Sequence, residues 1–313
     1  MTIRQFDWRD IQTLYRFRHQ SVFLYSALLL TRGPMLVPGA LLSYLAPSTG
    51  IFTATRKRTR RSETPIIGQM IQLSGSQFAH LTFVTPDSAL NEAPLGNLID
   101  YLAVQAAERG AFRLLADVDE GNPGYEALRG ASFAIYARQR IWQLAGQAIG
   151  ESVKNSWRVA TDRDSIGIRS LYNNLVPGLV QQVEPISPSN PRGLVYYESD
   201  NLLAYVELKY GHRGIWAQPF IHPDAEEASS WLVSLLNELP YRHSRPVYLC
   251  IRSYQSWLES ALEDLGAEAG PRQAVMVKHL AVPQKAFRSF ALPALEGGQP
   301  EATAPIAHAE QNS

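Results

Sequence analysis

A strand–helix–strand pattern between residues 80 and 118 constrains the fold of this 313-residue chain more than any other feature. The run 112–118 is short and apolar at most positions, as is typical of a buried strand. A strand, a crossover helix and a second strand of this length form a right-handed parallel pair. The loop after the first strand is therefore expected at the carboxyl edge of a sheet, where α/β folds bind ligands. The helix is predicted from apolar residues at helical spacing and from the glycine that ends it: Leu95, Leu98, Ile99, Leu102, Ala106 and Gly110.

The order of these elements occurs twice in the chain. Residues 204–223 parallel residues 67–86 without a gap, and an amphipathic helix, an apolar strand (247–251) and a second helix follow, as in the first half. A repeat of about 140 residues indicates a duplicated domain, because the repeats of solenoids are far shorter. The tail lacks any periodicity that could bury a face, so we expect it to be disordered. The predicted organisation is two mixed-sheet α/β domains (1–146 and 157–283), a linker (147–156) and the tail (284–313).

The helix of the first half resembles the GNAT superfamily of acetyl-CoA-dependent N-acetyltransferases. In that family this helix reads Leu-Leu-x-x-Leu-x-x-x-Ala-x-x-x-Gly, and the first-half helix fits every step of the pattern. The resemblance implies two tandem acyl-CoA N-acyltransferase domains. It also implies acetyl-CoA or another acyl-CoA as cofactor and an amine as acceptor, which the sequence does not specify. The matching residues are Leu98, Ile99, Leu102, Ala106 and Gly110.

The phosphate loop of the family departs from its pattern here. The resemblance aligns Leu90, Ala93 and Leu95 with the three signature positions of Arg/Gln-x-x-Gly-x-Gly/Ala, and none of them matches. Gly96 lies one step late, at the helix start, where backbone amides and the helix dipole attract phosphate. By resemblance, the strand backbone would pair with pantetheine and the helix start would hold the phosphates. The implied cofactor-binding residues are Phe83, Val84, Thr85, Gly96, Asn97 and Asn122.

The second half has carboxylates where its own phosphate site would lie. Asp224, Glu226 and Glu227 fall at the expected start of its helix, where they would cap the amides and oppose the dipole. A site filled by its own carboxylates is closed to a pyrophosphate. We therefore predict that any acyl-CoA binds the first half.

The catalytic groups of the family are sparse in this chain. His80 is the ionisable side chain best placed on the strand to act as a base, although an exposed histidine without a role fits the same position. Leu128, Arg129 and Leu262 occupy the region of the family's tyrosine acid. Tyr125 and Tyr254 lie earlier on their helices, so packing roles are expected. No metal-ligand spacing, Ser-His-Asp arrangement or Walker loop occurs in the sequence.

Composition excludes several classes of protein. The 29 basic and 29 acidic residues balance, which does not favour a nucleic-acid partner. Cys250, the single cysteine, lies in an apolar run and is expected to be a buried thiol. The apolar run 22–30 is too short to span a bilayer, and residues 1–20 do not read as a signal peptide. The basic run 56–61 is expected to be a solvated hairpin tip. A cytoplasmic protein without a membrane partner is expected.

Two hypotheses of different classes follow. The first is a GNAT-type N-acyltransferase with degenerate motifs, which the resemblance of the fold favours. The second is a non-catalytic tandem GNAT-like protein that serves as a binding or assembly scaffold, which the missing phosphate loop and tyrosine favour.

Overall fold

The computed structural model describes residues 3–280, apart from eight internal gaps. The predicted linker and the tail lie outside the described residues, so the domain boundaries stay a prediction. The gaps are 57–64, 91, 93, 145–156, 187–189, 199, 224–227 and 240–244.

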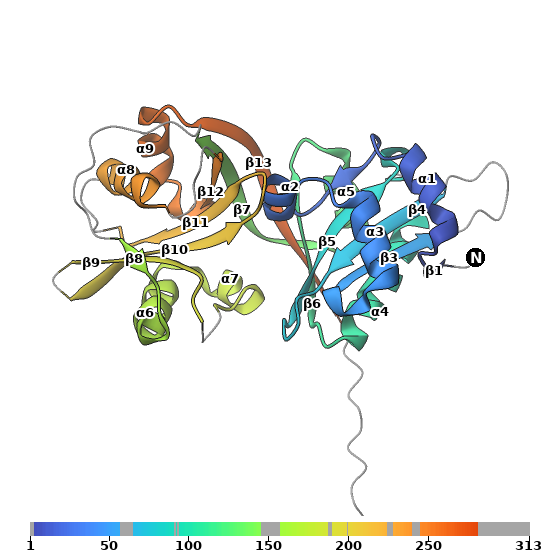
Figure 1. Ribbon diagram of the computed structural model, residues 1–313, viewed down its shortest axis with the longest axis horizontal. Helices are drawn as coiled ribbons and strands as arrows, with labels where there is room; N and C mark the ends of the chain where they lie inside the picture. Colours follow the sequence, from blue (N-terminus) through green and yellow to red (C-terminus); the bar gives the residue numbers. More distant parts are fainter. Residues whose placement is uncertain are drawn as a thin grey trace, which may run out of the picture. The chain divides into compact units, whose positions relative to one another are not determined.

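The described residues form a mixed α/β fold, as the sequence predicts (Figure 1). The strands are β1 (Ile3–Gln5), β2 (Val22–Phe23), β3 (Ile51–Arg56), β4 (Ile66–Ile71), β5 (Phe78–Thr85), β6 (Arg113–Asp119), β7 (Ala134–Leu144), β8 (Arg158–Val159), β9 (Gly193–Glu198), β10 (Asn201–Tyr210), β11 (Ile215–Ile221), β12 (Val247–Arg252) and β13 (Glu268–His279). The α-helices are α1 (Ile11–Arg16), α2 (Ser26–Arg32), α3 (Leu36–Leu45), α4 (Pro94–Glu108), α5 (Pro123–Gly130), α6 (Ser165–Leu175), α7 (Gly178–Val183), α8 (Ala228–Glu238) and α9 (Leu258–Asp264).

The strands join one continuous sheet in which the two halves exchange their last strands. The order is β1-β3-β4-β5-β6-β13-β7-β12-β11-β10-β9-β8, and β2 pairs with β5 off this path. β13, the last strand of the second half, lies between β6 and β7, with Met276 opposite Ala116. β7, the last strand of the first half, pairs with β12 of the second half, with Ile141 opposite Cys250. Each half therefore depends on the other for the pairing of its central strands.

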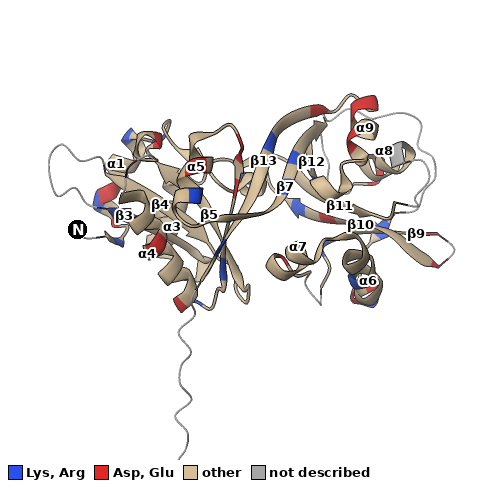
Figure 2. Cartoon of the chain, turned by 180° about the vertical axis from the view of Figure 1, so that it is seen from behind, with Lys and Arg blue, Asp and Glu red and all other residues tan. Residues whose placement is uncertain are grey.

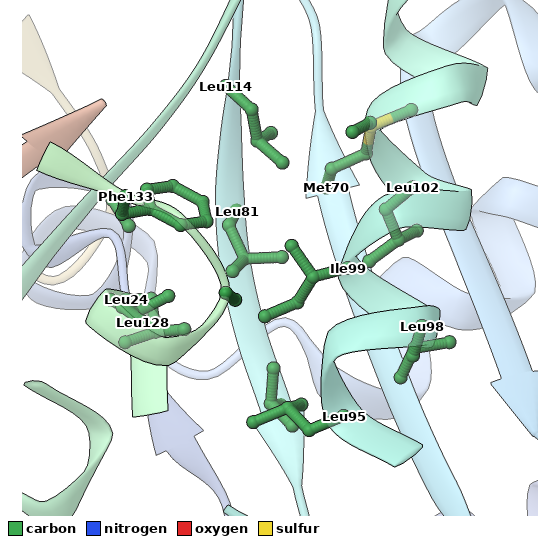
Figure 3. Close-up of a cluster of buried hydrophobic side chains, with 14 of the residues drawn as sticks. Leu24, Met70, Leu81, Leu95, Leu98, Ile99, Leu102, Leu114, Leu128 and Phe133 are labelled. Atoms are coloured by element: carbon green, nitrogen blue, oxygen red, sulfur yellow. The ribbon is translucent and has the colours of Figure 1, made fainter. Parts of the chain in front are cut away.

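Helices cover both faces of the first half of the sheet. The predicted crossover helix is present as α4, whose buried leucines face β3 to β6 (Figure 3). Gly68 lets α4 approach β4, because a Cβ there would lie 3.0 Å from Leu102 and 3.2 Å from Leu98. On the opposite face, Leu14 of α1 and Leu36 of α3 pack against Ile67 and Phe83.

The second half repeats this arrangement and also receives a helix from the first. α8 and α9 cover one face of β10 to β12, and α6 and α7 cover the other. The helix that the duplication requires between β11 and β12 is thus present as α8. α2 belongs to the first half in sequence, yet its Ala27 packs with Trp216 and Cys250 of the second half.

Three further features bear on function. No single helix in the described part of the chain is long and apolar enough to cross a membrane. The pair α2 and α3, which meet at a bend of 101°, is together long and apolar enough by length and composition only. No group of three or more His, Cys, Asp or Glu in the described residues could hold a metal. Acidic and basic residues occur along the elements of both halves (Figure 2).

Candidate functional site

The parallel strands β5 and β6 diverge and leave a cleft in the first half. They pair only at residues 78–80 with residues 113–115. Beyond His80 the chain fills this cleft with its own residues 22–26. The Leu24 N–H donates to the Thr82 carbonyl at 2.9 Å, and the Asp117 N–H donates to the Leu24 carbonyl at 3.0 Å. Residues 22–26, here called the closing segment, therefore bridge the two strands as an extra strand would.

The closing segment uses the strand groups that the sequence assigns to a cofactor. Phe83 and Val84 pair with residues 23 and 22 of β2, and both side chains are buried. The Thr85 hydroxyl donates to the Phe17 carbonyl at 3.1 Å. Pantetheine cannot pair along residues 83 and 84 while β2 is in place. The predicted pairing would require the closing segment to leave.

The other predicted cofactor residues lie apart from this strand. Gly96 and Asn97 lie in the first turn of α4, where Asn97 is exposed and the space beside Gly96 is open. Asn122 caps α5, because its Oδ1 accepts from the Gly124 N–H at 2.8 Å. The capping oxygen is thus already used by the fold. The six predicted residues are not gathered around one described cavity.

A second cleft opens between β11 and β12. These strands pair in parallel at residues 215–217 with residues 247–249 and then diverge. The Gln255 side chain fills the opening: its Nε2 donates to the Pro219 carbonyl at 2.8 Å, and its Oε1 accepts from the Ile221 N–H at 3.3 Å. One carboxamide thus makes the pair of hydrogen bonds that a peptide-like ligand would make along this edge. The acidic residues Asp224, Glu226 and Glu227 lie outside the described residues.

The fold is similar to that of solved structures. The tandem GNAT protein from the clavulanic acid biosynthesis pathway matches 89% of this chain and 98% of its own, with a TM-score of 0.51 and 14% identity. The chain has the GNAT fold. An acetyltransferase of the GNAT family from Colwellia psychrerythraea covers 89% of this chain and 100% of its own, with a TM-score of 0.44 and 11% identity. No protein-family model and no curated protein matches the sequence.

Proteins of the GNAT fold typically bind acyl-CoA, and the sequence predicts its site in the first half. The residues present do not fit that group. In the first cleft the strand edge is paired with the closing segment, and in the second the edge is capped by Gln255. Pro219 also removes one backbone donor from the second edge.

A polar cavity, here called the central cavity, lies between the halves. It has a volume of about 40 Å³. Its walls come from the closing segment, α2, the residue after α7, and strands β5, β6, β7, β10, β11, β12 and β13. The first half contributes His80 and Asp117, whereas the second contributes Lys209 and Arg252. The predicted candidate base therefore lies at a cavity wall, with ionisable neighbours that the sequence analysis did not name.

Two carboxylates and two cations face one another in the central cavity. Arg252 Nη2 lies 2.7 Å from Glu184 Oε2, and the Arg252 side chain is only 5% exposed. Asp117 Oδ2 accepts from the Ser26 N–H at 2.7 Å. Burial raises the pKa of Asp117 to about 6, although the Ser26 hydrogen bonds and the Arg252 charge lower it. Lys209 reaches solvent on one side, with a side chain that is 42% exposed.

His80 is held as a neutral ring. Burial, and then the positive charges of Lys209 and Arg252, lower the pKa of His80 to about 3. Its Nδ1 is buried and has no hydrogen-bond partner among the described residues. A ring with so low a pKa is a weak base near neutral pH. Its assignment as a catalytic residue stays a prediction.

The remaining residues singled out in the sequence have structural surroundings. Leu128 and Leu262, in the region of the family's tyrosine, are buried in the cores of the two halves. Tyr125 packs against the first of these cores. Burial raises the pKa of Tyr254. Cys250 is buried, as predicted, and its thiol donates to Gln139 Oε1 at 3.2 Å.

Sequence reasoning missed the ionisable residues that meet at the central cavity. Asp117 and Arg252 each follow a run of apolar strand residues, and a charge at that place was the available signal. Their meeting depends on the exchange of strands between the halves, which no local pattern encodes.

Proposed function

We propose that this protein is a non-catalytic binding protein built on a tandem GNAT fold. The observation that carries the proposal is that both clefts are closed by the chain's own groups, the first by the closing segment and the second by Gln255. The absence of the phosphate-loop signature and of a tyrosine acid supports the same conclusion.

The closure of the first cleft is a set of backbone interactions. Leu24 is linked to both strands by hydrogen bonds, and β2 adds pairing at Phe83 and Val84. Each such bond contributes about 1 kcal/mol net, so several together offset much of what a strand-pairing ligand could gain. Leu24 is also 1% exposed and packs in the core of the first half. A ligand would have to displace this packing as well.

The alternative is an acyl-CoA-dependent N-acyltransferase acting on an amine of unknown identity. It is supported by the fold and requires the closing segment to leave the cleft. The two functions differ in one measurable property, the binding of acyl-CoA.

Calorimetric titration with acetyl-CoA and with octanoyl-CoA tests the proposal. We expect no saturable heat with either ligand. A GNAT acetyltransferase of known affinity, titrated in the same buffer, is the positive control. Saturable heat with either acyl-CoA would overturn the proposal. If heat appears and Gly96→Asp weakens binding at least tenfold, about 1.4 kcal/mol, the cofactor occupies the first half.

A further inference from the structure

Several hydrogen-bond donors on residues that line the central cavity are buried and unpaired within the described chain. Arg252 Nε and Nη1, Tyr136 Oη and Trp216 Nε1 are buried without a hydrogen-bond partner among the described residues. All three residues line the cavity, and each is at least nine-tenths buried, with exposed fractions of 4%, 6% and 4%. Buried donors without partners cost about 1–3 kcal/mol each, so native structures rarely leave several together.

The two carboxylates in the cavity wall already accept hydrogen bonds from the protein. Glu184 Oε2 accepts a hydrogen bond from Arg252 Nη2, and Asp117 Oδ2 accepts one from the Ser26 N–H. Lys209 Nζ lies 3.8 Å from Glu207 Oε1, and both side chains are partly exposed to solvent. Arg252 Nε and Nη1 have no hydrogen bond to either carboxylate, although Glu184 and Asp117 both line the cavity.

We propose that the central cavity binds a small carboxylate or planar oxyanion, such as formate or acetate, between Arg252, Tyr136 and Trp216. Such a ligand supplies two or three acceptor oxygens, and carboxylates match the forked N–H groups of arginine. This inference goes beyond the proposed function, because it concerns neither cleft and does not depend on the acyl-CoA titration.

The volume limits the size of the ligand. A buried water molecule needs about 10–15 Å³ of cavity volume. The central cavity of about 40 Å³ therefore holds roughly three waters or a ligand of about four non-hydrogen atoms. Formate and acetate fit this limit, whereas succinate does not. Ordered water is the competing occupant, since it also offers acceptors to the same donors.

Thermal unfolding at pH 6 and constant ionic strength distinguishes the two occupants. We expect 100 mM formate or acetate to raise the unfolding midpoint by at least about 2 °C relative to chloride, and succinate to have no effect. Equal midpoints in chloride, formate and acetate would show that the cavity holds water only, and would overturn the proposal. An equal rise with succinate would also overturn it, because the cavity cannot hold that ion.

Two variants locate the effect. Tyr136→Phe removes one unpaired donor, so in chloride it should be at least as stable as the wild type, while the rise with formate falls by half or more. Arg252→Lys keeps the charge opposite Glu184 but loses Nε and the fork, and should abolish the rise. Tyr196→Phe and Arg140→Lys, which change residues outside the cavity wall, are the matched controls and should keep the full rise. A full rise in both cavity variants would place the anion elsewhere and overturn the proposal.

Discussion

Tyr25 lies flat against His80, with 4.0 Å between the ring centroids and 6° between the ring planes. Tyr25 belongs to the closing segment, and His80 is the last residue of β5 that pairs with β6. The stack therefore joins the segment that fills the first cleft to the wall of the central cavity. A ligand that displaced the closing segment would also break this stack.

Gln255→Leu should reduce the free energy of unfolding by roughly 2–4 kcal/mol. The substitution keeps most of the side-chain volume but leaves the Pro219 carbonyl and the Ile221 N–H without their partner in a buried position. Urea unfolding followed by tryptophan fluorescence measures the change. The control is Gln143→Leu at an exposed position of β7, which should stay within about 0.5 kcal/mol of the wild type. Equal stability of the two variants would contradict the role of Gln255.

His80→Phe should make the protein less sensitive to acid. The pKa of His80 is about 3 in the folded state and about 6.5 when unfolded, so the unfolded state binds an extra proton as the pH falls below 6.5. The wild type should lose about 2 kcal/mol from this group between pH 6.5 and 4.5, and the variant should not. Unfolding in urea across this range is the measurement. His19→Phe, at an exposed position, should keep the wild-type slope, and the same slope in all three proteins would contradict the low pKa of His80.

Asp117→Asn should act in the opposite direction. Because the folded pKa of Asp117, about 6, lies above its unfolded value, this carboxyl lowers stability as the pH rises from about 4 to 6. The variant should therefore be more stable than the wild type by roughly 3 kcal/mol at pH 7.5, and the difference should vanish below pH 4. Asp87→Asn, at an exposed position, is the control. A variant that is less stable at pH 7.5 would show that the ionised carboxylate stabilises the fold.

The isolated fragment 1–146 should not fold cooperatively. In the full chain, β6 pairs with β13 and β7 pairs with β12, and both partners belong to the second half. Without them the fragment exposes unpaired strand edges and part of its core. Circular dichroism and thermal unfolding test this, and adding the fragment 157–283 should restore a cooperative transition. A cooperative transition of the first fragment alone would contradict the dependence between the halves.

The fold was predictable from local patterns, whereas the state of the clefts was not. The helical spacing of Leu95, Leu98 and Leu102 is a local pattern that predicts α4. The family resemblance rests on this same helix. Residues 22–30 read only as a short apolar run, because the pairing of Val22 with Val84 joins positions far apart in the sequence. Gln255 likewise looks like an ordinary polar residue until β11 and β12 are brought together.

The account rests on the closing segment being part of the native first cleft, and amide hydrogen exchange at Leu24 and Asp117 tests this most directly. Both N–H groups are hydrogen bonded within the filled cleft. We expect both amides to exchange only through global unfolding, with protection equal to that of the most protected core amides and unchanged by acetyl-CoA. Rapid exchange at Leu24, or exchange that acetyl-CoA accelerates, would show that the segment leaves the cleft and would contradict the account.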